Sequence, residues 1–205
     1  MTELYVLNLK DRLAEPVDDY LHLFTPERRD KILRYRHNAD RNRTLWAELL
    51  VRHVISLRTK QNIESIHIMR DSNGKPRISP EYNLSFSISH SGEYAVCSIG
   101  EKPNGVDVEK LSRASHEISE RFFTDEEKMI LSGLNDEEFN RKFLCYWTLK
   151  ESYAKCTGMD LMSVIKNVNC EMISGRNFFI DDYVIGVCSD DLPDSIYEIK
   201  IPLTL

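Results

Sequence analysis

The chain has 205 residues, 41% hydrophobic and 29% charged, which is long enough to bury one large core or two small ones. Its formal net charge of −6 argues against generic nucleic-acid binding, and five scattered cysteines without a C-x-x-C pair argue against a disulfide framework or a zinc site. No apolar run approaches the roughly 20 residues that span a bilayer, and the first residues do not resemble a signal peptide. We therefore expect a cytoplasmic protein without membrane or nucleic-acid partners.

The first part of the chain predicts one strand followed by two helices. Residues 3–9 form an apolar run typical of a strand. Thr25 and Pro26 are a favourable helix start, and apolar residues at helical spacing predict two helices between about residues 26 and 59. Basic residues are concentrated from Arg28 to Arg58. This concentration suits a small polyanion, although solvated helix faces produce the same pattern.

The middle of the chain predicts three strands separated by turns. Residues 71–74 form a turn, and the strict alternation of residues 83–90 indicates a half-buried strand. Residues 94–99 form a second strand, residues 101–105 a turn, and residues 106–109 begin a third strand.

The last part turns helical from Thr124, and residues 139–156 form the clearest helix of the sequence. The tail over residues 163–203 returns to strand-like alternation. This order predicts an α+β protein of two similar halves that meet near residues 100–110. We take residues 1–103 and 104–205 as the two domains.

Two carboxylates stand on the strand that begins near residue 106. Asp107 and Glu109 point to one face, whereas Val106 and Val108 point to the other. Adjacent carboxylates repel each other unless a cation lies between them, and hard oxygen ligands suit Mg²⁺. In a chain with 33 acidic residues, two acids separated by one residue are common, so the alternative is that Asp107 and Glu109 are ordinary surface acids and not metal ligands.

The clearest helix carries the most specific pattern. Trp147, Glu151 and Lys155 are spaced i, i+4, i+8 and therefore share one face. Glu151 could serve as a third metal ligand or as a base, and Lys155 could contact a phosphate oxygen. The alternative is an ordinary Glu–Lys pair that stabilises the helix by about 0.2–0.5 kcal/mol.

Phosphate could be contacted from three further places. Ser89 and His90 end a strand just before a glycine turn, although His90 could equally be a histidine at the edge of the core. Lys75 follows a tight turn, and Arg28 and Lys31 lie about one helical turn apart. Taken alone, these cations are also compatible with ordinary surface charge.

In this order, the motifs resemble the Sfp-type 4′-phosphopantetheinyl transferases. The resemblance runs from about residue 26 to residue 160, through Gly74-Lys75-Pro76 and residues 86–92, 105–109, 121–123 and 147–155. It implies a pseudo-twofold α+β fold of two α/β halves, with coenzyme A in the cleft between them. It also implies transfer of 4′-phosphopantetheine from coenzyme A to a serine of an apo acyl or peptidyl carrier protein, with release of 3′,5′-ADP. A monomer serving nonribosomal peptide or polyketide (antibiotic) biosynthesis is expected.

The resemblance also assigns roles to individual residues. Asp107, Glu109 and Glu151 would bind Mg²⁺, and Lys155 would contact the pyrophosphate of coenzyme A. Glu151, acting directly or through a metal-bound water, is the first candidate for the base that activates the carrier serine, and Glu127 is the second. The remaining coenzyme A contacts would come from Arg28, Lys31, Thr44, Ser89 and His90 near the 3′-phosphate and from Gly74, Lys75 and Pro76 near the adenine.

Two other functions stay open from the sequence. The same three carboxylates could serve a Mg²⁺-dependent phosphotransferase acting on another nucleotide, or the site could be an inert module that binds coenzyme A or a carrier. For a carrier protein, docking is expected on residues 110–124, which include Arg113, and on the segment after Gly158. Phe122 and Phe123 either take part in this docking or pack in the core.

Overall fold

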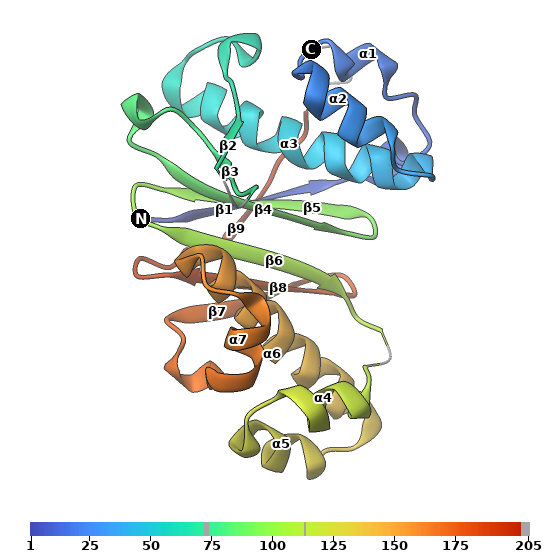
Figure 1. Cartoon of the computed structure of the whole chain (residues 1–205), viewed down its shortest axis with the longest axis vertical. Helices are drawn as coiled ribbons and strands as arrows, with labels where there is room; N and C mark the ends of the chain where they lie inside the picture. Colours follow the sequence, from blue (N-terminus) through green and yellow to red (C-terminus); the bar gives the residue numbers. More distant parts are fainter. Residues whose placement is uncertain (72–73, 113, 202–205) are drawn as a thin grey trace.

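The computed structural model describes residues 1–71, 74–112 and 114–201, and it has the α+β composition expected from the sequence (Figure 1). Two sheets face each other in the middle of the molecule. Figure 1 shows helix α3 (Asn38–Thr59) covering the outer side of one sheet and helix α6 (Asp136–Thr157) covering the outer side of the other. Each half therefore packs a 22-residue helix against a sheet.

The other elements follow the expected order with small shifts. The first half adds β1 (Glu3–Asn8), α1 (Asp18–Leu21), α2 (Pro26–Leu33), β2 (Met69–Arg70), β3 (Pro76–Arg77), β4 (Ser85–Ser91) and β5 (Tyr94–Gly100). The second half adds β6 (Asn104–Lys110), α4 (His116–Phe122), α5 (Asp125–Ser132), α7 (Leu161–Asn167), β7 (Gly175–Ile180), β8 (Tyr183–Ser189) and β9 (Ile196–Glu198).

The strand order shows that the halves are not purely consecutive segments. The first sheet has the order β4-β5-β1-β9, in which β9 pairs in parallel with β1 and the other pairs are antiparallel. The second sheet has the antiparallel order β6-β8-β7. Strand β9, from the end of the described chain, thus completes the sheet of the first half.

Side-chain alternation along the strands builds the layers. In the described part of the chain, three apolar clusters fill the spaces between α3 and the first sheet, between the two sheets, and between the second sheet and α6. Val96 of the first sheet and Val106 of the second sheet both belong to the cluster between the sheets. Val184 belongs instead to the cluster on the α6 side, together with Phe143. The two halves are therefore joined by a continuous apolar layer, and the edges of their sheets are held close together.

Local signals explain the start of α2 and both ends of α6. The Thr25 hydroxyl accepts a hydrogen bond from the Arg28 amide, so the predicted start of α2 is confirmed. Asn135 and Glu138 form a capping box at the start of α6, and Gly158 ends that helix with φ 77°.

Two local predictions were wrong. Residues 161–167 form helix α7 rather than a strand, because the Asp160 carboxylate caps a helix by accepting from the Ser163 amide at 2.8 Å. Strand β6 begins at Asn104, inside the predicted turn, because the Asn104 side chain bonds to Ser98 at 2.6 Å and to the Ser85 carbonyl at 3.0 Å. These bonds fix the first residues of β6 against the neighbouring sheet.

Gly105 allows α6 to approach β6 closely. A Cβ atom at this position would lie 1.9 Å from the Ser152 carbonyl oxygen. We expect Gly105→Ala to lower the free energy of unfolding by about 1–3 kcal/mol or more, because two backbones would have to separate. Urea unfolding would measure this, with Gly133→Ala as the control, since a Cβ there would meet its nearest atom at 3.7 Å. Equal stabilities of the two variants would contradict the prediction.

Candidate functional site

Strand β4 of the first sheet lies beside strand β6 of the second sheet, and serine side chains connect them. The Ser89 hydroxyl donates to Asp107 Oδ1 at 2.7 Å, and the Ser91 hydroxyl donates to Glu109 Oε2 at 2.9 Å. The alternation predicted for β4 puts both serines on one face, opposite the two acids of β6. The border between the halves therefore carries a polar, acid-containing edge.

Helix α6 adds the third carboxylate and a cation to this edge. The Lys155 ammonium donates to Asp107 Oδ1 at 2.7 Å and to the Val106 carbonyl at 3.1 Å. Burial, followed by repulsion from Asp107 and Glu109, raises the pKa of Glu151 to about 7, although Lys155 opposes this effect. Burial and repulsion from Asp107 also raise the pKa of Glu109. Three acids are thus close enough to disfavour one another's charge.

The acid cluster has features that suit a divalent cation without being preassembled for one. Within the described residues, Asp107 Oδ2 is buried and has no hydrogen-bond partner other than Glu151, whose pKa a side-chain hydrogen bond with Asp107 helps to raise. No three His, Cys, Asp or Glu side chains of these residues are already placed as a metal site. Lys155 and Ser89 occupy the other oxygen of Asp107. A cation would relieve the repulsion that raises the pKa of Glu151, and carboxylate oxygens are the ligands that Mg²⁺ prefers. The donor set therefore fits Mg²⁺ chemically.

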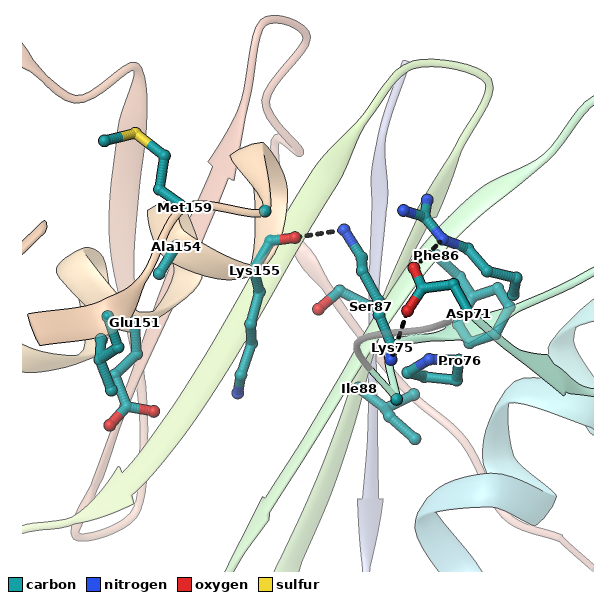
Figure 2. Close-up of a pocket in the computed structure, with 14 residues that line it drawn as sticks. Asp71, Lys75, Pro76, Phe86, Ser87, Ile88, Glu151, Ala154, Lys155 and Met159 are labelled. Atoms are coloured by element: carbon teal, nitrogen blue, oxygen red, sulfur yellow. Dashed lines mark hydrogen bonds and ion pairs between the residues drawn. The ribbon is translucent and has the colours of Figure 1, made fainter. Parts of the chain in front are cut away.

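A cavity of about 370 Å³ opens between the halves beside these acids (Figure 2). Figure 2 shows Glu151 and Lys155 on α6, with Lys75 and Pro76 facing them from the first half. The Lys75 ammonium donates to the Lys155 carbonyl oxygen and so connects the two halves across the cavity. Gly74, with φ 79°, also lines the cavity next to Lys75.

A second cavity of about 320 Å³ adjoins the first, since both are lined by Pro76, Ile88 and Lys155. Its other walls are mostly basic or polar. Desolvation by the surrounding protein, and then the nearby cations Arg43 and Lys155, lower the pKa of His90, which lines this cavity. The structure therefore brings together in this second cavity the five residues predicted near a 3′-phosphate: Arg28, Lys31, Thr44, Ser89 and His90.

Sequence reasoning missed two residues of this second cavity's wall. Arg70 lines the cavity, and Glu48 lies behind it with only 2% of its surface exposed. Glu48 Oε2 accepts from Arg28 Nε at 2.8 Å and from an Arg70 terminal nitrogen at 3.1 Å. Glu48 is one of three acids on the mainly basic 28–58 stretch, and neither Glu48 nor Arg70 belongs to a recognisable motif.

Glu127, the second candidate for the base, lies in the core of the second half instead of at the cavities. It is fully buried, and its Oε2 accepts from the Lys150 ammonium at 2.6 Å and from the Thr124 amide at 3.1 Å. Its Oε1 accepts from the Cys170 amide at 3.0 Å. These contacts hold Glu127 in the core, whereas Glu151 lines the first cavity.

The two phenylalanines near the expected docking segment differ. Phe123 is buried and stacks on Phe143 with ring centroids 5.1 Å apart, whereas Phe122 is partly buried beneath Arg121 and Lys166. Arg113 lies outside the described residues. Phe123 is thus a core residue, and Phe122 is the member of the pair that reaches the surface.

Two broader expectations can also be compared with the structure. All five cysteines are free. Among the described residues, no helix combines the length and the apolar character needed to cross a bilayer.

Comparison with known proteins identifies the family. Residues 15–101 match the family described as "4′-phosphopantetheinyl transferase, N-terminal", and residues 103–194 match the family described as "4′-phosphopantetheinyl transferase superfamily". The chain is 32% identical over 181 residues to the 4′-phosphopantetheinyl transferase Sfp of Bacillus subtilis (strain 168), covering 88% of this chain and 76% of the relative.

Two further relatives come from a second bacterium and from a mammal. The 4′-phosphopantetheinyl transferase psf-1 of Bacillus pumilus is 33% identical over 151 residues, which cover 73% of this chain and 65% of the relative. The mouse L-aminoadipate-semialdehyde dehydrogenase-phosphopantetheinyl transferase is 31% identical over 150 residues, which cover 66% of this chain and 48% of the relative. With both halves matched and the acid cluster at their border, the chain belongs to the 4′-phosphopantetheinyl transferase superfamily.

Proposed function

We propose that this protein transfers the 4′-phosphopantetheine group of coenzyme A to a serine of an apo acyl or peptidyl carrier protein and releases 3′,5′-ADP. Bacterial relatives named as 4′-phosphopantetheinyl transferases support this assignment. We further propose that one copy of the chain is sufficient, since both walls of the cavities come from a single chain. Carriers of nonribosomal peptide or polyketide synthesis are the proposed partners.

The observation that carries the proposal is the order of charges along the two adjoining cavities. The second cavity is lined by cations of the first half, and the first cavity ends at Glu151 and Lys155 on α6. Coenzyme A has a phosphomonoester at one end of its nucleotide and a pyrophosphate in its middle. The second cavity, which we call the basic cavity, suits the phosphomonoester. The acid cluster with Lys155 suits a pyrophosphate held together with a divalent cation.

Asp107, Glu109 and Glu151 are the residues that would hold Mg²⁺. When bound, this ion would neutralise charge on the pyrophosphate and on the departing 3′,5′-ADP. Lys155 would turn from Asp107 to the pyrophosphate oxygens, so that its positive charge stays within the site.

The proposed reaction forms one bond and breaks one. The carrier serine oxygen attacks the phosphorus that bears the pantetheine arm, and the bond from this phosphorus to the bridging oxygen breaks. The electron pair leaves with the bridging oxygen on 3′,5′-ADP, and Glu151 accepts the serine proton.

Intact-mass spectrometry of an apo carrier domain incubated with this protein, coenzyme A and Mg²⁺ tests the proposal. We expect the mass of one phosphopantetheine to be added to the carrier serine, and the addition to disappear with EDTA. Thermal shifts with coenzyme A, ATP and other nucleotides address the alternatives. Protection by another nucleotide but not by coenzyme A would favour a different phosphotransferase, and coenzyme A binding without transfer to any carrier would favour an inert module.

Lys155→Ala is expected to raise the KM for coenzyme A about 10–100-fold, the range that corresponds to losing a hydrogen bond to a charged group. Steady-state kinetics with varied coenzyme A would measure this, and Lys102→Ala, at an exposed lysine in the turn before β6, is the control. An unchanged KM for coenzyme A in the Lys155 variant would remove Lys155 from the pyrophosphate contact.

A further inference from the structure

A single buried carboxylate stands behind the basic cavity and contacts two of its arginines. Glu48 lies on α3, and its Oε2 accepts from Arg28 Nε at 2.8 Å and from Arg70 at 3.1 Å. Arg28 comes from α2 and Arg70 from β2, so three elements meet at this one oxygen. The side chain of Glu48 is 2% exposed, compared with 13% for Arg28 and 29% for Arg70. The acid is therefore behind the two guanidinium groups, and the arginines are nearer to the solvent.

This arrangement leaves hydrogen-bond donors for a ligand. A guanidinium group has five N–H donors, and Glu48 uses one from each arginine. A further Arg70 nitrogen donates to the Gly74 carbonyl at 2.9 Å, which ties Arg70 to the turn beside Lys75. Both arginines line the basic cavity.

Besides the arginines, the wall of this cavity contains a hydroxyl group that suits a ligand with acceptor oxygens. In the described part of the chain, Thr44 Oγ1 is buried without a hydrogen-bond partner, although Thr44 lines the cavity. An unpaired buried hydroxyl is costly unless a ligand satisfies it. Lys31 adds another positive charge to the wall. A phosphomonoester, with several acceptor oxygens and two charges, satisfies these groups together.

We propose that Glu48 is the positioning residue that determines selectivity for the 3′-phosphate of coenzyme A, because it holds Arg28 and Arg70 in fixed orientations. The inference rests on the proposed function. Arginine binds phosphate through two parallel N–H groups, so its orientation matters more than its charge alone. Holding both side chains before the ligand arrives reduces the entropy lost on binding.

A purely electrostatic role for Glu48 leads to the opposite expectation. Removing this acid makes the cavity more positive, so attraction alone would tighten the binding of coenzyme A in Glu48→Gln. Loss of positioning would weaken it. The sign of the change therefore separates the two roles.

Isothermal titration of coenzyme A and of dephospho-coenzyme A, which lacks the 3′-phosphate, provides the test. For Glu48→Gln we expect the Kd of coenzyme A to rise about tenfold and that of dephospho-coenzyme A to stay within about twofold of wild type. In kinetics, the KM for coenzyme A should rise while kcat is kept. The matched control is Glu81→Gln, at an exposed glutamate of the same half.

Arg28→Lys is the second variant, because it keeps the positive charge but removes the Nε donor that Glu48 accepts. We expect it also to weaken coenzyme A binding. In a protein that already carries Arg28→Lys, adding Glu48→Gln should raise the Kd of coenzyme A by less than Glu48→Gln does in the wild-type protein. If Glu48→Gln does not fold, Arg28→Lys decides alone, and an unchanged Kd for coenzyme A would overturn the inference.

The remaining outcomes separate this inference from the proposed function. A wild-type protein that neither binds coenzyme A nor modifies a carrier overturns both. Wild-type transfer together with an unchanged or lower Kd for coenzyme A in Glu48→Gln overturns the inference alone. An equal rise for both ligands does the same, because it points to a general loss of structure.

Discussion

Glu151→Gln is expected to slow phosphopantetheine transfer about 10²–10⁴-fold, the range associated with a lost general base, while leaving the fold intact. Glutamine has the same shape but cannot accept the serine proton, and it is a weaker ligand for Mg²⁺. The variant should fold normally, because Glu151 is crowded by Asp107 and Glu109 and its charge is already disfavoured. Single-turnover transfer to a carrier, followed by mass spectrometry, measures the effect.

The stability of the metal-free Glu151 variant gives an independent readout. The pKa of Glu151 in the folded protein, about 7, lies above the ordinary value of 4.5, so the folded state binds the proton more tightly than the unfolded state does. This contribution to stability is present below about pH 4.5 and is lost as the pH rises through about 7. Glu151→Gln should weaken this pH dependence, whereas Glu101→Gln, at an exposed glutamate, should not. Near-normal turnover of Glu151→Gln would exclude Glu151 as both ligand and base.

Glu127→Gln is expected to lower the free energy of unfolding by about 3–5 kcal/mol, because it leaves a buried ammonium without its carboxylate. The side chains of Lys150 and Glu127 are 0% and 1% exposed, and their charged atoms lie 2.6 Å apart. Lys150 would retain its bond to the Ile165 carbonyl at 2.8 Å and its position 5.0 Å from the centroid of the Phe123 ring, but it would lose its anionic partner. Urea unfolding monitored by circular dichroism measures the change.

The double variant Glu127→Gln/Lys150→Met is the control for the Glu127 prediction. Replacing both partners removes the unpaired charge, so the double variant should recover part of the lost stability. Wild-type stability of Glu127→Gln together with abolished transfer would instead place Glu127 in the reaction.

Local sequence patterns predicted most of the secondary structure. Thr25 and Pro26 start α2 as expected, and the alternation before the glycine turn forms β4. Alternation along the observed strand places Ser89 and Ser91 on one face of β4. It could not predict that this face meets Asp107 and Glu109, because β4 and β6 belong to different sheets and their approach depends on how these sheets pack.

The difference between Glu127 and Glu151 shows where local patterns stop being informative. Both glutamates lie on helices with favourable starts, and the Thr124-x-x-Glu127 spacing marks Glu127 as part of a capping box but does not identify Lys150 as its buried partner. The distinction comes from the contacts of Glu127 with Lys150 and Cys170, which are 23 and 43 residues away. Glu48 was missed for the same reason, since its partners Arg28 and Arg70 lie 20 and 22 residues away.

The sequence by itself determined the α+β class, the two long helices, and the acids and cations that a magnesium-dependent coenzyme A site would need. These properties depend on periodicity, capping and residue chemistry, which are local along the chain. Only the tertiary structure decided that cations of the first half and Glu151 of the second line adjoining cavities, and that Glu48 contacts two of those cations. Those relations are set by the packing of two sheets and two helices, which joins residues far apart in the sequence.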